Sequence, residues 1–79
     1  MQVKMYGKTV GCKFCTRAKT ICEMNDFELE FIDVEAEGIS GAELSEIVGT
    51  RVQQIPQIFV DGVYVGGCDK FEELLASKS

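Results

Sequence analysis

Histidine is absent from this 79-residue sequence, proline occurs once, and acidic residues outnumber basic ones. Tetrahedral zinc sites use cysteine and histidine, so the missing histidine leaves the four cysteines as the usual zinc ligands. Lysine and arginine total 8 against 13 aspartates and glutamates, which gives a net charge of −5. No basic stripe is available to neutralise phosphates, and we therefore expect no nucleic-acid partner.

Long hydrophobic runs are also missing. No segment approaches the roughly 20 apolar residues of a membrane-spanning helix, and the chain opens into a strand-like segment instead of a signal peptide. A hydrophobic content of 46% nevertheless suffices for one packed core, and no repeat or linker divides the sequence. Residues 1–79 are therefore expected to form a single domain in the reducing cytoplasm, with no membrane partner, rather than a secreted disulfide scaffold.

Hydrophobic periodicity predicts alternating strands and helices. Residues 3–6 and 29–34 are strand-like and flank a helical pattern over residues 14–25. A capping box at residues 40–43 begins a second helix that Gly49 is suited to end. Asp61-Gly62 joins strands 58–60 and 63–65 as a hairpin, and residues 69–76 form a last helix. The order β-α-β-α-β-β-α predicts an α/β fold, in which a parallel first crossover and the hairpin form a four-stranded mixed sheet flanked by helices.

Two cysteines, in Cys12-Lys13-Phe14-Cys15, lie between the first strand and the first helix. The first sulfur then meets unpaired N–H groups at the positive end of the helix dipole, where thiolate is favoured. The second lies one turn later, close enough to close a ring. Half of a zinc site is disfavoured because Cys22 and Cys68 form no second Cys-x-x-Cys, and a four-residue disulfide ring adds little stability. The pair therefore predicts a reversible dithiol/disulfide switch.

Two further segments accompany the cysteine pair in order: Ile55-Pro56-Gln57-Ile58-Phe59-Val60 and Val65-Gly66-Gly67-Cys68-Asp69. With these motifs the chain resembles, over nearly its whole length, the small dithiol glutaredoxins of bacteria and their viruses. The resemblance implies a thioredoxin-like fold and a glutathione-dependent oxidoreductase that reduces protein disulfides and glutathione mixed disulfides. Cys12 would be the nucleophile and Cys15 the resolving thiol, and the two would form the redox-active disulfide.

The resemblance also implies a glutathione site. The matching proline of the family is cis and leaves the backbone before it, here that of Ile55, free to pair with glutathione. The start of the last helix would receive the γ-glutamyl carboxylate, and Lys8 with Arg51 or Gln53 would meet the glycyl carboxylate. The residues expected to bind glutathione are Lys8, Phe14, Arg51, Gln53, Gln54, Ile55, Pro56, Gly67, Cys68, Asp69 and Lys70.

Three features depart from the family pattern. Lys13-Phe14 replaces the usual Pro-Tyr, and the charge of Lys13 should favour the Cys12 thiolate. The loop over residues 7–11 is one residue longer than usual. Lys70 stands where the family commonly has aspartate, so weaker glutathione binding is expected. Cys22 is expected to be a buried hydrophobe, whereas for Cys68 a regulatory thiol and an inert packing role are both open.

Partners follow from the same resemblance. Glutathione is the expected reductant, no metal is expected, and the substrates are disulfide-containing proteins such as ribonucleotide reductase, reduced by a monomer. Two alternatives stay open: an iron–sulfur carrier in which two chains share a cluster through Cys12 and glutathione, and a redoxin of similar fold that takes electrons from thioredoxin reductase.

Overall fold

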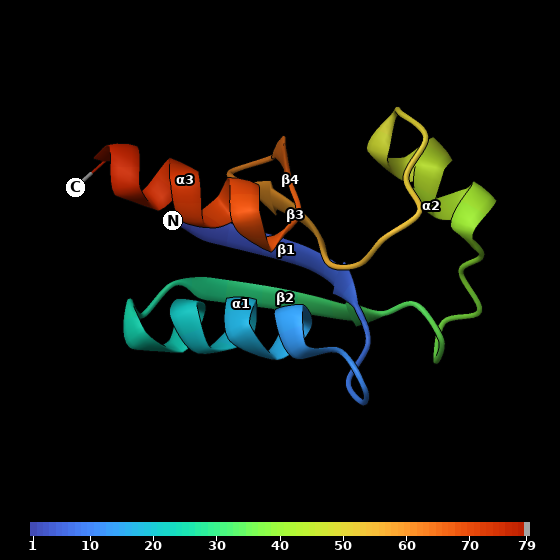
Figure 1. The fold of residues 1–79 in the computed structure, drawn as a ribbon, viewed down its shortest axis with the longest axis horizontal. Helices are drawn as coiled ribbons and strands as arrows, with labels where there is room; N and C mark the ends of the chain where they lie inside the picture. The colour runs from blue at the N-terminus through green and yellow to red at the C-terminus, as the bar shows by residue number, and fades with distance from the viewer. Residues whose placement is uncertain (79) are drawn as a thin grey trace.

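The protein is described by a computed structural model over residues 1–78. Along the chain, Figure 1 shows β1 (Gln2–Gly7), α1 (Lys13–Met24), β2 (Glu28–Asp33), α2 (Gly41–Val48), β3 (Gln57–Val60), β4 (Val63–Gly66) and α3 (Cys68–Lys78). The element order predicted from the sequence is confirmed, as are the mixed sheet and its flanking helices. The differences lie at element ends, where α1 and α3 each begin one residue earlier than predicted.

The four strands lie in the order β2-β1-β3-β4. β1 is parallel to β2, with pairs from Gln2↔Glu28 to Gly7↔Asp33, whereas β1–β3 and β3–β4 are antiparallel. The hairpin turn places both Asp61 and Gly62 at positive φ, 50° and 83°, which aspartate and glycine tolerate. β1 is thus an interior strand, and its last pair brings Gly7 beside Asp33.

The two faces of the sheet carry separate hydrophobic clusters, because alternate side chains of a strand point to opposite sides. Val3 and Met5 of β1 pack with α1 and α3 in one cluster, which includes the fully buried Phe71. Tyr6 points the other way and packs with Leu44 of α2. α1 and α3 therefore cover one face, and the short α2 lies over one end of the other (Figure 1).

Helix boundaries follow local capping chemistry. Ser40 Oγ accepts a hydrogen bond from Glu43 N at 3.1 Å, as the capping box predicts, and Gly49 ends α2 in the left-handed region at φ 89°. Cys12 is the N-cap of α1, so the first cysteine of the pair belongs to the helix start. Across residues 1–78, none of the helices has the length and apolar character needed to cross a membrane.

Candidate redox site

Cys12 and Cys15 are joined by a disulfide at the start of α1, with their Cα atoms 5.3 Å apart. The sequence predicted this pairing. Cys12 adopts extended backbone angles, φ −126° and ψ 104°, which place its side chain over the first helical turn. Its Sγ accepts a hydrogen bond from Cys15 N at 3.2 Å, so an otherwise unpaired helix N–H points at the first sulfur. This contact favours negative charge on Cys12 when the disulfide is open.

The two sulfurs have different surroundings. Cys12 is half-buried at the surface, whereas Cys15 is 0% exposed. Cys15 Sγ lies against the end of β1, where a Cβ added to Gly7 would stand 2.7 Å from it and 3.3 Å from the Phe31 ring. Lys8 N donates a hydrogen bond to the same sulfur at 3.5 Å. The backbone at the end of β1 therefore forms the wall behind the second cysteine.

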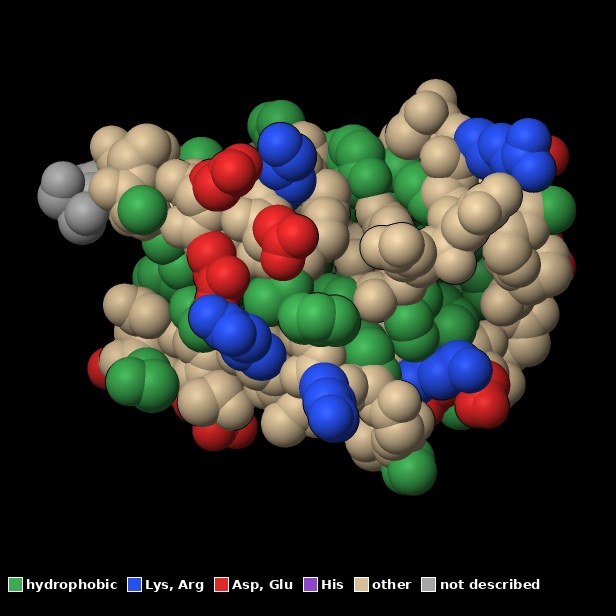
Figure 2. Space-filling view, in the orientation of Figure 1, with side chains coloured by type: hydrophobic (Ala, Val, Ile, Leu, Met, Phe, Trp, Pro, Cys, Tyr) green, Lys and Arg blue, Asp and Glu red, His purple; other side chains and the backbone are tan. Residues whose placement is uncertain are grey.

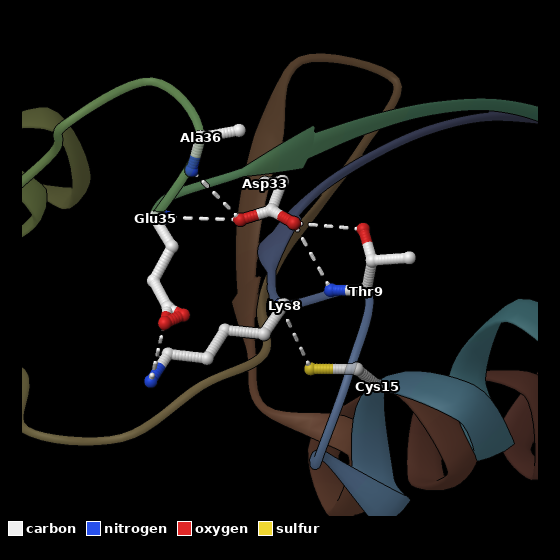
Figure 3. A network of polar contacts seen from close by, with 6 residues as sticks. All are labelled: Lys8, Thr9, Cys15, Asp33, Glu35 and Ala36. Atoms are coloured by element: carbon white, nitrogen blue, oxygen red, sulfur yellow. Dashed lines mark hydrogen bonds and ion pairs between the residues drawn. The ribbon is translucent and has the colours of Figure 1, made fainter.

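Asp33, at the end of β2, binds Thr9 in the segment that follows β1 (Figure 3). Its Oδ2 accepts hydrogen bonds from Thr9 N at 3.2 Å and Thr9 Oγ1 at 2.7 Å. Its Oδ1 accepts from Glu35 N at 2.9 Å and Ala36 N at 3.1 Å. These bonds, that of the Thr9 hydroxyl first, lower the pKa of Asp33 below its ordinary value because they stabilise the charged carboxylate.

Sequence reasoning did not single out Asp33 or Gly7 as site residues. Asp33 lay in an acidic stretch, and its contact with Thr9 requires the parallel register of β1 and β2. The proximity of Gly7 to Cys15 requires the packing of α1 on the sheet. The available signal was weak: a glycine at the strand end before the cysteine loop indicates close approach of another group.

Lys8, Arg51 and Gln53, which were predicted for the glycyl end of glutathione, line two adjoining hollows together with other predicted residues. Lys8, Gln53, Gln54 and Ile55 line one of about 350 Å³, where Lys8 Nζ lies 3.8 Å from Glu35 Oε1. Arg51 lines the other, also of about 350 Å³, with Gln53 and Gln54. The structure thus brings Lys8 together with residues 53–55 and places Arg51 in the neighbouring hollow.

Pro56 and Gly67 lie side by side between these hollows and the start of α3. The Ile55–Pro56 peptide bond is cis, as the family resemblance implied, and Pro56 is buried directly before β3. A Cβ on Gly67 would stand 3.5 Å from the Pro56 carbonyl oxygen. The segment before β3 therefore contacts the start of α3, and Figure 1 shows both near the start of α1.

The remaining residues that were predicted to bind glutathione point to different parts of the surface. Phe14 is 56% exposed beside the cysteines, and Asp69 is exposed in the first turn of α3. Lys70 instead packs along Gly66, lines a hollow beside β4 and pairs with Glu73 Oε2 at 3.4 Å. Lys70 therefore has partners on α3 and β4, and its predicted contact with the γ-glutamyl end of glutathione stays a prediction.

The other two cysteines are packing residues. Cys22 is 1% and Cys68 4% exposed, and both belong to the cluster beneath α1 and α3. Burial raises the pKa of both thiols, with further contributions from Glu23 at Cys22 and chiefly from Glu72 at Cys68. Neutral, enclosed thiols react slowly, so Cys22 matches its prediction and Cys68 favours the inert role over the regulatory one.

Charged side chains on the site face largely compensate one another. Arg17 Nε lies 2.5 Å from Glu72 Oε1 and so links α1 to α3, and Lys8 pairs with Glu35. Figure 2 shows such basic and acidic groups in contact around exposed hydrophobic surface. Lys13 is exposed and forms no ion pair within residues 1–78. The uncompensated positive charge nearest Cys12 in sequence is therefore that of Lys13.

Comparison with known proteins gives one answer. The family model described as glutaredoxin matches residues 3–65. The chain belongs to the glutaredoxin family. A glutaredoxin of Haemophilus influenzae is 41% identical over 95% of this chain and 91% of its own, and glutaredoxin 1 of Salmonella typhimurium is 46% identical over 78% and 77%. The solved structure of reduced Escherichia coli glutaredoxin has a TM-score of 0.81 at 35% identity, covering 98% of this chain and 95% of that one.

Membership of the glutaredoxin family agrees with the disulfide-bonded cysteine pair at the start of α1. The fold is thioredoxin-like, and the protein is a glutathione-dependent thiol–disulfide oxidoreductase with a redox-active cysteine pair. Exchange requires an accessible sulfur with thiolate character, which the start of α1 supplies. Within residues 1–78, His, Cys, Asp and Glu form no group of three suited to hold a metal ion.

Gly7→Ala tests the wall behind Cys15. The added Cβ would stand 2.7 Å from a buried sulfur, so we expect a loss of about 1–3 kcal/mol in unfolding free energy, typical of overpacking. Gly41→Ala is the matched control, because a Cβ there meets nothing within 4 Å, and it should be neutral or slightly stabilising. Urea unfolding of the oxidised proteins measures both changes. Equal stability of the two variants would contradict the close approach.

Proposed function

We propose that this glutaredoxin works through two unequal thiols, Cys12 attacking and Cys15 resolving. The observation that carries the proposal is the contrast between a half-buried Cys12 at the helix start and a fully enclosed Cys15. The Cys12 thiolate attacks a substrate disulfide, forms a mixed disulfide and releases one substrate thiolate. The Cys15 thiolate then attacks Cys12 Sγ and releases the second, and two glutathione molecules restore the dithiol. The substrate gains the two electrons that glutathione gives up.

Glutathione, the proposed reductant, is placed across the face formed by α1, the segment before β3 and the start of α3. Lys8, Gln53 and Gln54 line the hollow for its glycyl end, and Arg51 adjoins it. The backbone of Ile55 and Pro56 pairs with glutathione beside the cysteines, and Gly67 lets the ligand approach its backbone closely. The N–H groups of Cys68 and Asp69, at the start of an 11-residue helix, favour a carboxylate. Phe14 flanks the site.

A solved relative supports glutathione as the ligand. The buckwheat glutaredoxin–glutathione complex has a TM-score of 0.79 at 25% identity and covers 96% of this chain. Lys70, directed toward β4, contributes little to this site in our proposal. We further propose that residues 1–79 form one cytoplasmic, monomeric domain that uses no metal and reduces protein disulfides such as that of ribonucleotide reductase.

Serine variants separate the two thiols. Cys12→Ser should abolish activity on a glutathione mixed disulfide, since the three remaining thiols are enclosed. Cys15→Ser should lose dithiol reduction of protein disulfides yet keep deglutathionylation, which needs one attacking thiol. Steady-state turnover on a glutathionylated peptide and on a protein disulfide measures both. Full activity of Cys12→Ser on the peptide would refute the assignment.

Lys13→Glu tests the electrostatic support of the Cys12 thiolate. Replacing an uncompensated cation at the helix start with an anion should slow iodoacetamide alkylation of Cys12 about three- to tenfold at neutral pH, the range for exposed charges near one reacting group. Lys19→Glu makes the same charge change on the same helix, where Lys19 Nζ lies 4.4 Å from the Phe31 ring centroid. It should alter the rate by less than about twofold. Equal slowing in both variants would show an effect of net charge alone.

A further inference from the structure

Asp33 fixes the segment that touches the buried sulfur, although it lies on a different strand. At the end of β1, three successive residues have backbone partners: Gly7 O accepts from Val34 N at 2.9 Å, Lys8 N donates to Cys15 Sγ at 3.5 Å, and Thr9 N donates to Asp33 Oδ2 at 3.2 Å. The Lys8 N–H is therefore held between two anchors. Both anchors belong to β2 or the residue that follows it (Figure 3).

The Lys8 N–H is placed where a resolving thiolate needs a donor. Cys15 is 0% exposed, and burial disfavours a thiolate unless hydrogen bonds replace water. In the disulfide form, Lys8 N already donates to Cys15 Sγ, and such a bond strengthens when the sulfur is charged. A shift of Thr9 would turn the preceding peptide, which carries this donor.

We propose that Asp33 is a positioning residue for the second step of the exchange: by clamping Thr9, it holds the Lys8 N–H on Cys15 Sγ and so favours attack by the Cys15 thiolate. This inference rests on the proposed role of Cys15 as resolving thiol. In that step a bond forms between Cys15 Sγ and Cys12 Sγ, the bond from Cys12 Sγ to the glutathione sulfur breaks, and glutathione leaves as thiolate with the electron pair. No external oxidant or reductant is required.

A purely local role would leave half of the contacts unexplained. The bonds from Glu35 N and Ala36 N to Oδ1 cap the turn that follows β2. The two bonds from Thr9 to Oδ2 join residues that are 24 positions apart in the sequence, and they contribute nothing to that turn. The bonds on both oxygens, that of the Thr9 hydroxyl first, lower the pKa of Asp33.

Asp33→Asn separates the two halves of the network. The remaining amide oxygen can still accept from Glu35 N and Ala36 N, whereas the amide nitrogen cannot accept from Thr9. The experiment prepares the Cys12–glutathione mixed disulfide and follows glutathione release without added thiol. We expect Asp33→Asn to slow this release by about fivefold or more, the effect of losing one hydrogen bond to a charged group. Attack by Cys12, measured in the Cys15→Ser background, should change by less than about twofold.

Asp61→Asn is the matched control. Its carboxylate also accepts a backbone N–H of β1, from Gln2 at 2.8 Å, but at the opposite end of the strand. Release and attack should both stay within about twofold of the parent. Unchanged release in Asp33→Asn, or equal slowing of release and attack, would overturn the positioning role.

Variants of Thr9 and the release rate of Cys15→Ser test the proposal if Asp33→Asn cannot. If Asp33→Asn does not fold, Thr9→Val replaces it: losing the hydroxyl donor at 2.7 Å should slow release alone, and Thr9→Ser should restore the parent rate. Unchanged release in Thr9→Val would then overturn the inference. Release from Cys15→Ser at the parent rate would instead show that Cys15 is not the resolving thiol, which is a failure of the proposed function and not of the Asp33 network.

Discussion

The contact between Cys15 Sγ and the end of β1 is the constraint on which the site depends. It requires a residue without Cβ at position 7, a free N–H at Lys8 and a helix that begins immediately after the loop. Because the sulfur of Cys15 is enclosed on this side, the disulfide presents Cys12 toward solvent. The different roles that we propose for two chemically identical thiols therefore follow from packing against one strand end.

The mixed sheet explains why this strand end is so well defined. β1 is paired on both sides, with β2 and β3, and its side chains pack into hydrophobic clusters on both faces of the sheet. Its last pair, Gly7↔Asp33, places a carboxylate beside the cysteine loop. The cysteine loop is thus attached to a strand that is paired on both sides, which holds the sulfurs on a rigid element.

Much of this architecture could be predicted from the sequence because its signals are local. Ser40, Gly49 and Asp61-Gly62 act within a few residues of themselves, and the structure has the expected cap, helix end and turn at each. The cysteine pair was equally local. Asp33 was missed because its partner Thr9 is close only through the parallel register, and register depends on the whole core.

The directions of long side chains, like the contact between Asp33 and Thr9, could not be predicted from local sequence signals. Lys70 was expected at the glutathione site, and its packing along Gly66 and its pair with Glu73 were not predicted. Lys8 was expected at one carboxylate with Arg51 or Gln53; Gln53 lines the hollow of Lys8, and Arg51 lines the adjoining one. Long polar side chains select their partners from whatever the folded surface offers, so their directions require the tertiary structure.

The account is tested most directly by locating glutathione on the protein. The Cys15→Ser protein, labelled with ¹⁵N and carrying glutathione on Cys12, would be compared with its reduced form by amide chemical shifts. The account predicts the largest changes at residues 53–55 and 67–69, besides the start of α1. A larger hollow of about 670 Å³ lies on the sheet face opposite α1 and α3 and away from the cysteines, lined in part by Lys4, Tyr6 and Phe59. Changes concentrated there, or confined to the start of α1, would contradict it.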